Sequence, residues 1–151
     1  MLPDVRPSRA LILGLGGGTI ALLLMRRFGS IPIVGVEIEP QVIRLARSAF
    51  GLDLPNVEIL EGDALQYVLQ AEGRFDYVAV DLFAGDVIPS EIFAKPFLRA
   101  VRRLLNPGGL AAFNFFKDRR TPARQRRLAE VFPRVVLADS GKNVVAVCRP
   151  R

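Results

Sequence analysis

The chain has 151 residues, half of them hydrophobic and 24% charged, so its size and composition are those of one globular domain, expected to span residues 1–151. Its single cysteine, Cys148, excludes an internal disulfide and favours a cytoplasmic location, and the lack of histidine excludes the common zinc sites and leaves acid–base chemistry to carboxylates, lysine or tyrosine. The net charge of +6 comes mainly from scattered arginines, and the one dense basic stretch, residues 117–127, has no aromatic side chains for base stacking, so no nucleic-acid partner is expected.

An uncharged run extends from residue 10 to residue 25. A secretory signal is not expected, because glycines interrupt the run, a small-residue cleavage site is lacking and Arg26 follows at once; the run is also shorter than the roughly 20 apolar residues of a membrane span. We therefore predict no membrane association. The run divides into a buried strand at residues 10–13, a glycine loop and a helix at residues 19–27.

Strands and helices then alternate along the chain. A second strand is predicted at residues 33–37, and Pro40 occupies the first turn of a helix that extends to about residue 49. The next predicted elements are a strand at 57–60, a helix at 64–70, a strand at 75–80, a helix at 95–105, the turn signal Asn106-Pro107-Gly108-Gly109 and a strand at 110–115. Short strands that are apolar on both faces and alternate with helices predict a parallel sheet covered on both sides.

The last part of the chain departs from this alternation. After a helix at about residues 121–131, two β-rich runs at 134–138 and 143–148 are joined by only four residues. This connection is too short for a right-handed crossover and predicts an antiparallel hairpin. The expected fold class is therefore α/β, a doubly wound Rossmann-like sheet of seven strands with a C-terminal antiparallel hairpin.

Ligands of doubly wound sheets bind beyond the carboxyl ends of the strands, where this chain carries glycines and acids. Four glycines follow the first strand, Glu37 ends the second, Asp63 follows the third and Asp81 follows the fourth. Glycines let the backbone approach a ligand, Glu37 is placed to accept hydrogen bonds from both ribose hydroxyls, and Asp63 is placed to accept one from an adenine amino group. The combination predicts an adenosine-cofactor site in preference to a purely structural turn.

The glycine spacing limits the kind of cofactor. A dinucleotide fingerprint requires glycine at its first, third and sixth positions, and the sixth position here is Thr19. The Gly-Lys-Ser/Thr of a triphosphate-binding loop is also missing from the sequence. Cofactors with a pyrophosphate or triphosphate are therefore disfavoured.

Five segments carry a family resemblance: "LILGLGGGT", "VGVEIEPQVIRLAR", "VEILEGDALQYV", "FDYVAVDLFAGDVIPSEIF" and "RRLLNPGGLAAFNF". Together they resemble the successive motifs of the spermidine/spermine synthase family, the polyamine aminopropyltransferases, within the class I S-adenosylmethionine-dependent methyltransferase fold. The resemblance implies S-adenosylmethionine, or its decarboxylated form, as cofactor and Asp81 as the base that accepts a proton from the attacking amine. The cofactor contacts that it implies are Gly14, Gly16, Gly17, Gly18, Glu37, Ile38, Asp63, Ala64, Asp81 and Leu82.

Three departures from that family bear on the substrate. The family usually has an aspartate where this chain has Gly17, and a second acid where it has Ala84. The family's N-terminal β-rich domain is represented here by only nine residues before the first strand. The carboxylates left as candidates to bind ammonium groups are Asp81, Asp86 and Glu91.

We therefore expect a transferase that moves a methyl or aminopropyl group to a small-molecule amine or other acceptor, by in-line attack on the sulfonium carbon. The alternatives are a non-catalytic module that binds an adenosyl cofactor and an NAD-dependent reductase; a homodimer is left open. Two further interpretations concern the ends of strands four and five. Asn114 is interpreted first as a turn residue, and Phe83, Phe115 and Phe116 are interpreted as core in preference to the wall of a cleft.

Overall fold

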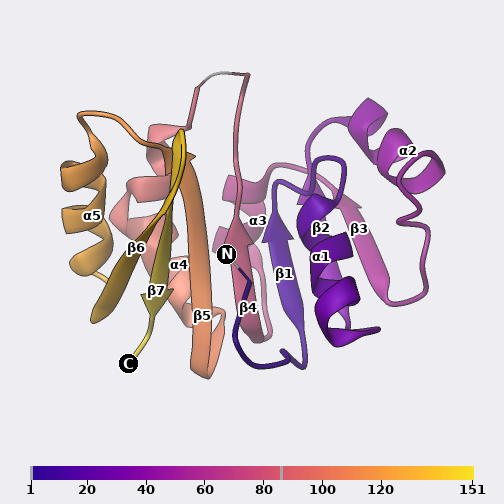
Figure 1. The fold of residues 1–151 in the computed structure, drawn as a ribbon, viewed down its shortest axis with the longest axis horizontal. Helices are drawn as coiled ribbons and strands as arrows, with labels where there is room; N and C mark the ends of the chain where they lie inside the picture. Colours follow the sequence, from indigo (N-terminus) through magenta and orange to yellow (C-terminus); the bar gives the residue numbers. More distant parts are fainter. Residues whose placement is uncertain (1, 86) are drawn as a thin grey trace.

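The structure, a computed structural model, describes residues 2–85 and 87–151, in which strands and helices alternate as predicted (Figure 1). In chain order the elements are β1 (Ala10–Leu13), α1 (Thr19–Phe28), β2 (Ile33–Glu37), α2 (Pro40–Ser48), β3 (Val57–Glu61), α3 (Ala64–Gln70), β4 (Phe75–Val80), the 3-10 helix η1 (Ser90–Phe93), α4 (Lys95–Arg103), β5 (Leu105–Phe116), α5 (Thr121–Ala129), β6 (Arg134–Ser140) and β7 (Asn143–Arg149). The helix η1 was not predicted, and the start of β5 was predicted five residues too late. None of the helices in the described part of the chain is long and apolar enough to cross a membrane.

The seven strands form one sheet in the order β3-β2-β1-β4-β5-β7-β6. Strands β1 to β5 are parallel, and β7 pairs antiparallel with both β5 and β6. The doubly wound fold class and the terminal hairpin are thus confirmed. The chain passes from β3 at one edge to β4 beside β1, so the direction of winding reverses between β1 and β4, where such folds bind ligands.

Each face of the sheet is covered by its own set of helices (Figure 1). Leu11 and Leu13 of β1 pack in the core beneath α3, α4 and α5. Ile12 of the same strand faces the opposite side, where it packs beneath α1 and α2. All three side chains are fully buried, as expected for a central strand apolar on both faces. The core therefore fixes β1 rigidly and with it the start of the glycine loop.

The predicted turn at residues 106–109 lies inside β5 and not before it. Phe75 pairs with Leu105 and Tyr77 pairs with Leu110, so the four residues between them bulge out opposite Asp76. Gly108 has a φ of 86°, which the turn requires, and Asn106 Nδ2 donates to Asp76 Oδ1 at 2.7 Å. The turn predicted from these residues is present, but β5 pairs with β4 both before and after it, which the sequence alone does not reveal.

Candidate functional site

The loop after β1 depends on glycines for two different reasons. Gly14, Gly16 and Gly18 have φ values of 84°, 54° and 83°, a region that other residues rarely adopt. A Cβ on Gly14 would lie 2.3 Å from the Asp81 carbonyl oxygen, and one on Gly18 would lie 2.0 Å from Leu52 Cδ1. A Cβ on Gly16 would meet nothing within 4 Å. Gly14 and Gly18 therefore permit close packing, whereas the backbone of Gly16 borders open space.

Gly17 differs from its neighbours in the loop. Its φ is not positive, and a Cβ there would come no closer than 3.4 Å to another atom, in the ring of Phe50. The backbone therefore does not require glycine at the position where the resembled family has an aspartate.

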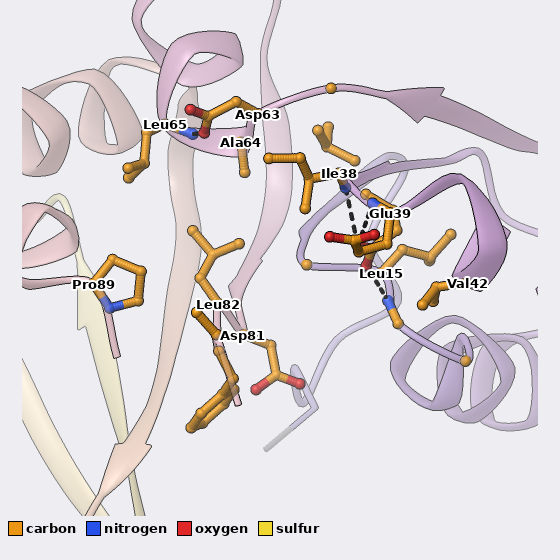
Figure 2. A pocket seen from close by; sticks show the side chains of 18 of the residues that line it. Leu15, Ile38, Glu39, Val42, Asp63, Ala64, Leu65, Asp81, Leu82 and Pro89 are labelled. Atoms are coloured by element: carbon orange, nitrogen blue, oxygen red, sulfur yellow. Dashed lines mark hydrogen bonds between the residues drawn. The ribbon is translucent and has the colours of Figure 1, made fainter. Parts of the chain in front are cut away.

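Glu37 joins the glycine loop to the turn after β2. Its Oε2 accepts from the backbone N–H of Gly16 at 2.8 Å, and its Oε1 accepts from those of Ile38 and Glu39 at 2.9 and 3.1 Å. The dashed lines in Figure 2 include these bonds. The carboxylate predicted to bind ribose is thus held at the cavity wall by three backbone donors.

Asp63 and Ala64 lie where β3 passes into α3. Asp63 is the N-cap of that helix, and its Oδ1 accepts from the backbone N–H of Leu65 at 2.8 Å. In Figure 2, Leu82 points from the end of β4 toward Ala64 and Ile38. These apolar side chains come from three different strand ends and form facing walls suited to a flat ring.

The loops after β1 to β4 enclose a cavity of about 580 Å³. Of the ten predicted cofactor residues, all but Gly18 line it; Gly18 instead packs against Leu52. The other lining residues were not among the predicted cofactor contacts. They are Leu15, Thr19, Ile20, Val36, Glu39, Val42, Gly62, Leu65, Phe83, Ala84 and Pro89. Most of these are apolar residues of helix starts and loops, which carry no distinguishing signal in a single sequence.

Asp81 is the acid at the carboxyl end of β4. Burial raises the pKa of its carboxyl group, and a hydrogen bond from Asn114 Nδ2 to Oδ1, at 2.8 Å, opposes that rise. Oδ2 has no hydrogen-bond partner among the residues that the structure describes. The first interpretation of Asn114 was wrong, because this residue lies within β5, paired with Val145 of β7.

The segment after Asp81 supplies one wall of the cavity, with Leu82, Phe83 and Ala84 among its lining residues. Phe83 lines the cavity and meets Phe116 edge to face, with ring centroids 5.1 Å apart, so its expected place in the core is corrected to a cavity wall. Phe115 is fully buried, as expected. Of the three candidate carboxylates for ammonium groups, Asp81 lines the cavity, Glu91 does not, and Asp86 lies outside the described residues.

Known proteins resemble this chain in sequence and in fold. The family described as "Methyltransferase domain" matches residues 10–109. The polyamine aminopropyltransferase of Neisseria meningitidis serogroup A is 31% identical over 153 residues, which cover 97% of this chain and 58% of that protein. The chain therefore spans little more than half the length of this relative.

Two solved structures share the fold. Human methyltransferase-like protein 13, in complex with SAH, superposes with a TM-score of 0.86 at 24% identity over 96% of this chain and 72% of that one. A probable spermidine synthase from Corynebacterium glutamicum gives a TM-score of 0.86 at 25% identity, over 95% of this chain and 56% of that one. Both superpositions cover nearly the whole of this chain.

Proposed function

Because this chain belongs to the methyltransferase-domain family and has the class I S-adenosylmethionine-dependent fold, we propose that it is a transferase that uses S-adenosylmethionine or its decarboxylated form. The observation that carries the proposal is the meeting of Gly16 and Glu37 at one cavity, where an open backbone lies beside a fixed carboxylate. The cavity volume of about 580 Å³ falls within the range of small-molecule sites. The chain is spermidine-synthase-like in sequence, which adds aminopropyl transfer to methyl transfer as a candidate reaction.

The residues around the cavity fit the parts of an adenosyl cofactor. Glu37 would accept hydrogen bonds from ribose hydroxyls, and the backbone of Gly14, Gly16 and Gly17 would border the methionine-derived chain. Asp63 would accept from the adenine amino group, with the ring held between Ile38, Ala64 and Leu82. When bound, such a cofactor supplies an electrophilic carbon on sulfur together with its own leaving group.

Asp81 would act on the acceptor. Its Oδ2 would accept the proton that the nucleophile loses as the new bond to carbon forms, while the carbon–sulfur bond breaks and leaves a neutral thioether. A positioned base of this kind contributes on the order of 10²–10⁴-fold to rate. Holding the nucleophile in line with the breaking bond contributes the larger share.

The acceptor side of the cavity favours a small acceptor with one amine. Phe83, Ala84 and Pro89 line it, and Asp81 is its one carboxylate among the described residues. A polyamine carries several ammonium groups that call for several carboxylates, so single amines are the first acceptors to test. We also propose a cytoplasmic location, in keeping with a chain that has no pair of cysteines for an internal disulfide.

Calorimetry with S-adenosylmethionine, its decarboxylated form, methylthioadenosine and NAD tests the proposal. We expect the adenosyl compounds to bind and NAD not to bind; a ligand at 100 times its Kd stabilises the fold by about 2.7 kcal/mol, which a thermal shift detects. Binding of NAD alone would overturn the proposal. Light scattering of the purified chain tests the homodimer.

The second candidate is a module that binds the cofactor without catalysis. It is favoured by Gly17 and Ala84, which stand where the resembled family has carboxylates. Adenosyl binding without product from any amine, in an assay that detects released thioether, would support the module.

A further inference from the structure

A chain of three polar side chains crosses the sheet at its carboxyl edge. Asp81 follows β4, Asn114 lies near the end of β5 and Asn143 begins β7, and these strands are neighbours. Asn114 Nδ2 donates to Asp81 Oδ1 at 2.8 Å, and Asn143 Nδ2 donates to Asn114 Oδ1 at 3.0 Å. All three side chains are partly buried, so water competes weakly for these bonds.

The strand register places the two asparagines within reach of each other. Asn114 pairs with Val145, and Phe116 pairs with Asn143 two residues along each strand. Asn114 and Asn143 are therefore diagonal neighbours on one face of the sheet, close enough for side chains to bond. The hairpin of β6 and β7 thus reaches the acid at the end of β4 through a single intermediate residue.

The direction of the hydrogen bonds follows from the acid at one end. An ionised carboxylate only accepts hydrogen bonds, so Asn114 must present its NH₂ group to Asp81. Its amide oxygen then faces Asn143, which must present an NH₂ group in turn. A reversed amide at Asn114 would set its oxygen against the Asp81 carboxylate. By donating to that oxygen, Asn143 keeps the Asn114 NH₂ group directed at Asp81.

We propose that Asn114 and Asn143 are positioning residues that fix the Asp81 carboxylate in one orientation, with Oδ1 occupied and Oδ2 left to accept a proton from the acceptor. The assignment of that proton to Asp81 rests on the proposed function; the hydrogen-bond chain itself does not. Because Asn114 donates to the ionised form of the acid, it limits the rise in the pKa of Asp81 that burial causes. Asn143 acts on Asp81 only through Asn114.

Among the described residues, the titratable side chain facing Asp81 is Tyr77, four residues earlier on β4. Burial raises the pKa of Tyr77, and the charge of Asp81 raises it further. Tyr77 therefore stays protonated throughout the pH range in which the carboxyl group titrates.

The test is a carbon NMR titration of the Asp81 carboxyl group in the whole chain, with the signal assigned by Asp81→Asn. We expect the midpoint to move to higher pH in Asn114→Ala, which removes the donor, and in Asn114→Asp, which keeps the shape but opposes a second carboxylate. Asn143→Asp should also move it upward, because an aspartate at position 143 needs a donor and turns the Asn114 amide away from Asp81.

The fold provides a matched control. Asn106 Nδ2 donates to Asp76 Oδ1 at 2.7 Å, an asparagine–aspartate pair on the same two strands but at the opposite end of the sheet. Asn106→Ala should leave the Asp81 midpoint unchanged. A general loosening of the fold would act on both ends alike, so this control separates positioning from stability.

The outcomes are distinct. A midpoint that stays in place in both Asn114 variants overturns the role of Asn114, and one that moves in these but not in Asn143→Asp overturns the role of Asn143. Failure of the proposed function appears elsewhere, as a lack of adenosyl binding to the unmodified chain. Where an acceptor is turned over, the Asn143 variant should lower kcat with an unchanged KM for the cofactor, and the acid limb of its pH profile should follow the NMR midpoint.

Discussion

Glu37 shares its carboxylate between two loops, since Gly16 donates to one oxygen while Ile38 and Glu39 donate to the other. Glu37→Gln keeps the shape but replaces one acceptor by a donor that faces a backbone N–H. Hydrogen bonds to charged groups contribute about 1.5–3 kcal/mol, so we expect methylthioadenosine to bind roughly ten- to hundred-fold more weakly in calorimetry. Glu61→Gln, at the exposed end of β3, is the control, and equal affinity in the two variants would remove Glu37 from the ribose site.

Asp81 links activity to stability. Its pKa is raised in the folded state by burial, so the folded chain binds this proton more tightly than the unfolded chain does, and stability falls as pH rises from the unfolded pKa through the folded one. Asp81→Asn still accepts a hydrogen bond from Asn114 but carries no charge. We expect it to lower the rate of transfer by roughly 10²–10⁴-fold and to raise Tm relative to the unmodified chain at pH 7, with a smaller difference in Tm near pH 4. A difference that grows toward acid pH would contradict this account.

Single residues could be predicted where one strand end determines their place. The acids Glu37, Asp63 and Asp81 follow apolar runs whose parallel pairing is visible in the sequence, so their meeting at one cavity followed from the fold class. Asn114 could not be predicted in the same way. Its partner depends on the register between β4, β5 and β7, which the apolar pattern of each strand does not determine alone.

Among the elements, glycines of two loops separate backbone strain from packing: Gly14 and Gly17 in the loop after β1, and Gly51 in the loop after α2. Gly14→Ala combines a positive φ with a clash against backbone, Gly51→Ala has the positive φ without a close neighbour, and Gly17→Ala has neither. A left-handed conformation costs about 1–2 kcal/mol for a residue with Cβ. We therefore expect urea unfolding to rank stability loss as Gly14 first, Gly51 second and Gly17 last. A loss at Gly17 as large as at Gly14 would contradict the loop geometry.

The bulge in β5 and the helix η1 are two features that the sequence did not predict. Asn106-Pro107-Gly108-Gly109 is a turn by composition, and only the pairing of Leu105 with Phe75 shows that the strand begins before it. The helix η1 is four residues long and has Pro89 at its N-cap. So short an element has no periodicity to detect, and it forms because Ile92 and Phe93 are buried in the core.

For the whole molecule, hydrogen exchange should show where an adenosyl ligand acts. We expect added methylthioadenosine to slow amide exchange in the segments that carry most of the cavity-lining residues, 14–20, 37–42 and 62–65, and to leave β6 and β7 unchanged. Amides in these segments exchange more slowly because the ligand must dissociate before the segments can open. Protection confined to the terminal hairpin would place the ligand elsewhere.

The cavity draws its described lining only from Gly14 to Pro89, while the rest of the chain supplies Asn114 and Asn143 at its margin. This division has an evolutionary consequence. Mutations in the last third of the chain can accumulate without altering the surface that meets a ligand, apart from those that disturb the core, these two asparagines or Phe116, which packs against Phe83. Descendants of such a domain should keep residues 14–89 nearly constant, and the last third of their chains should diverge more.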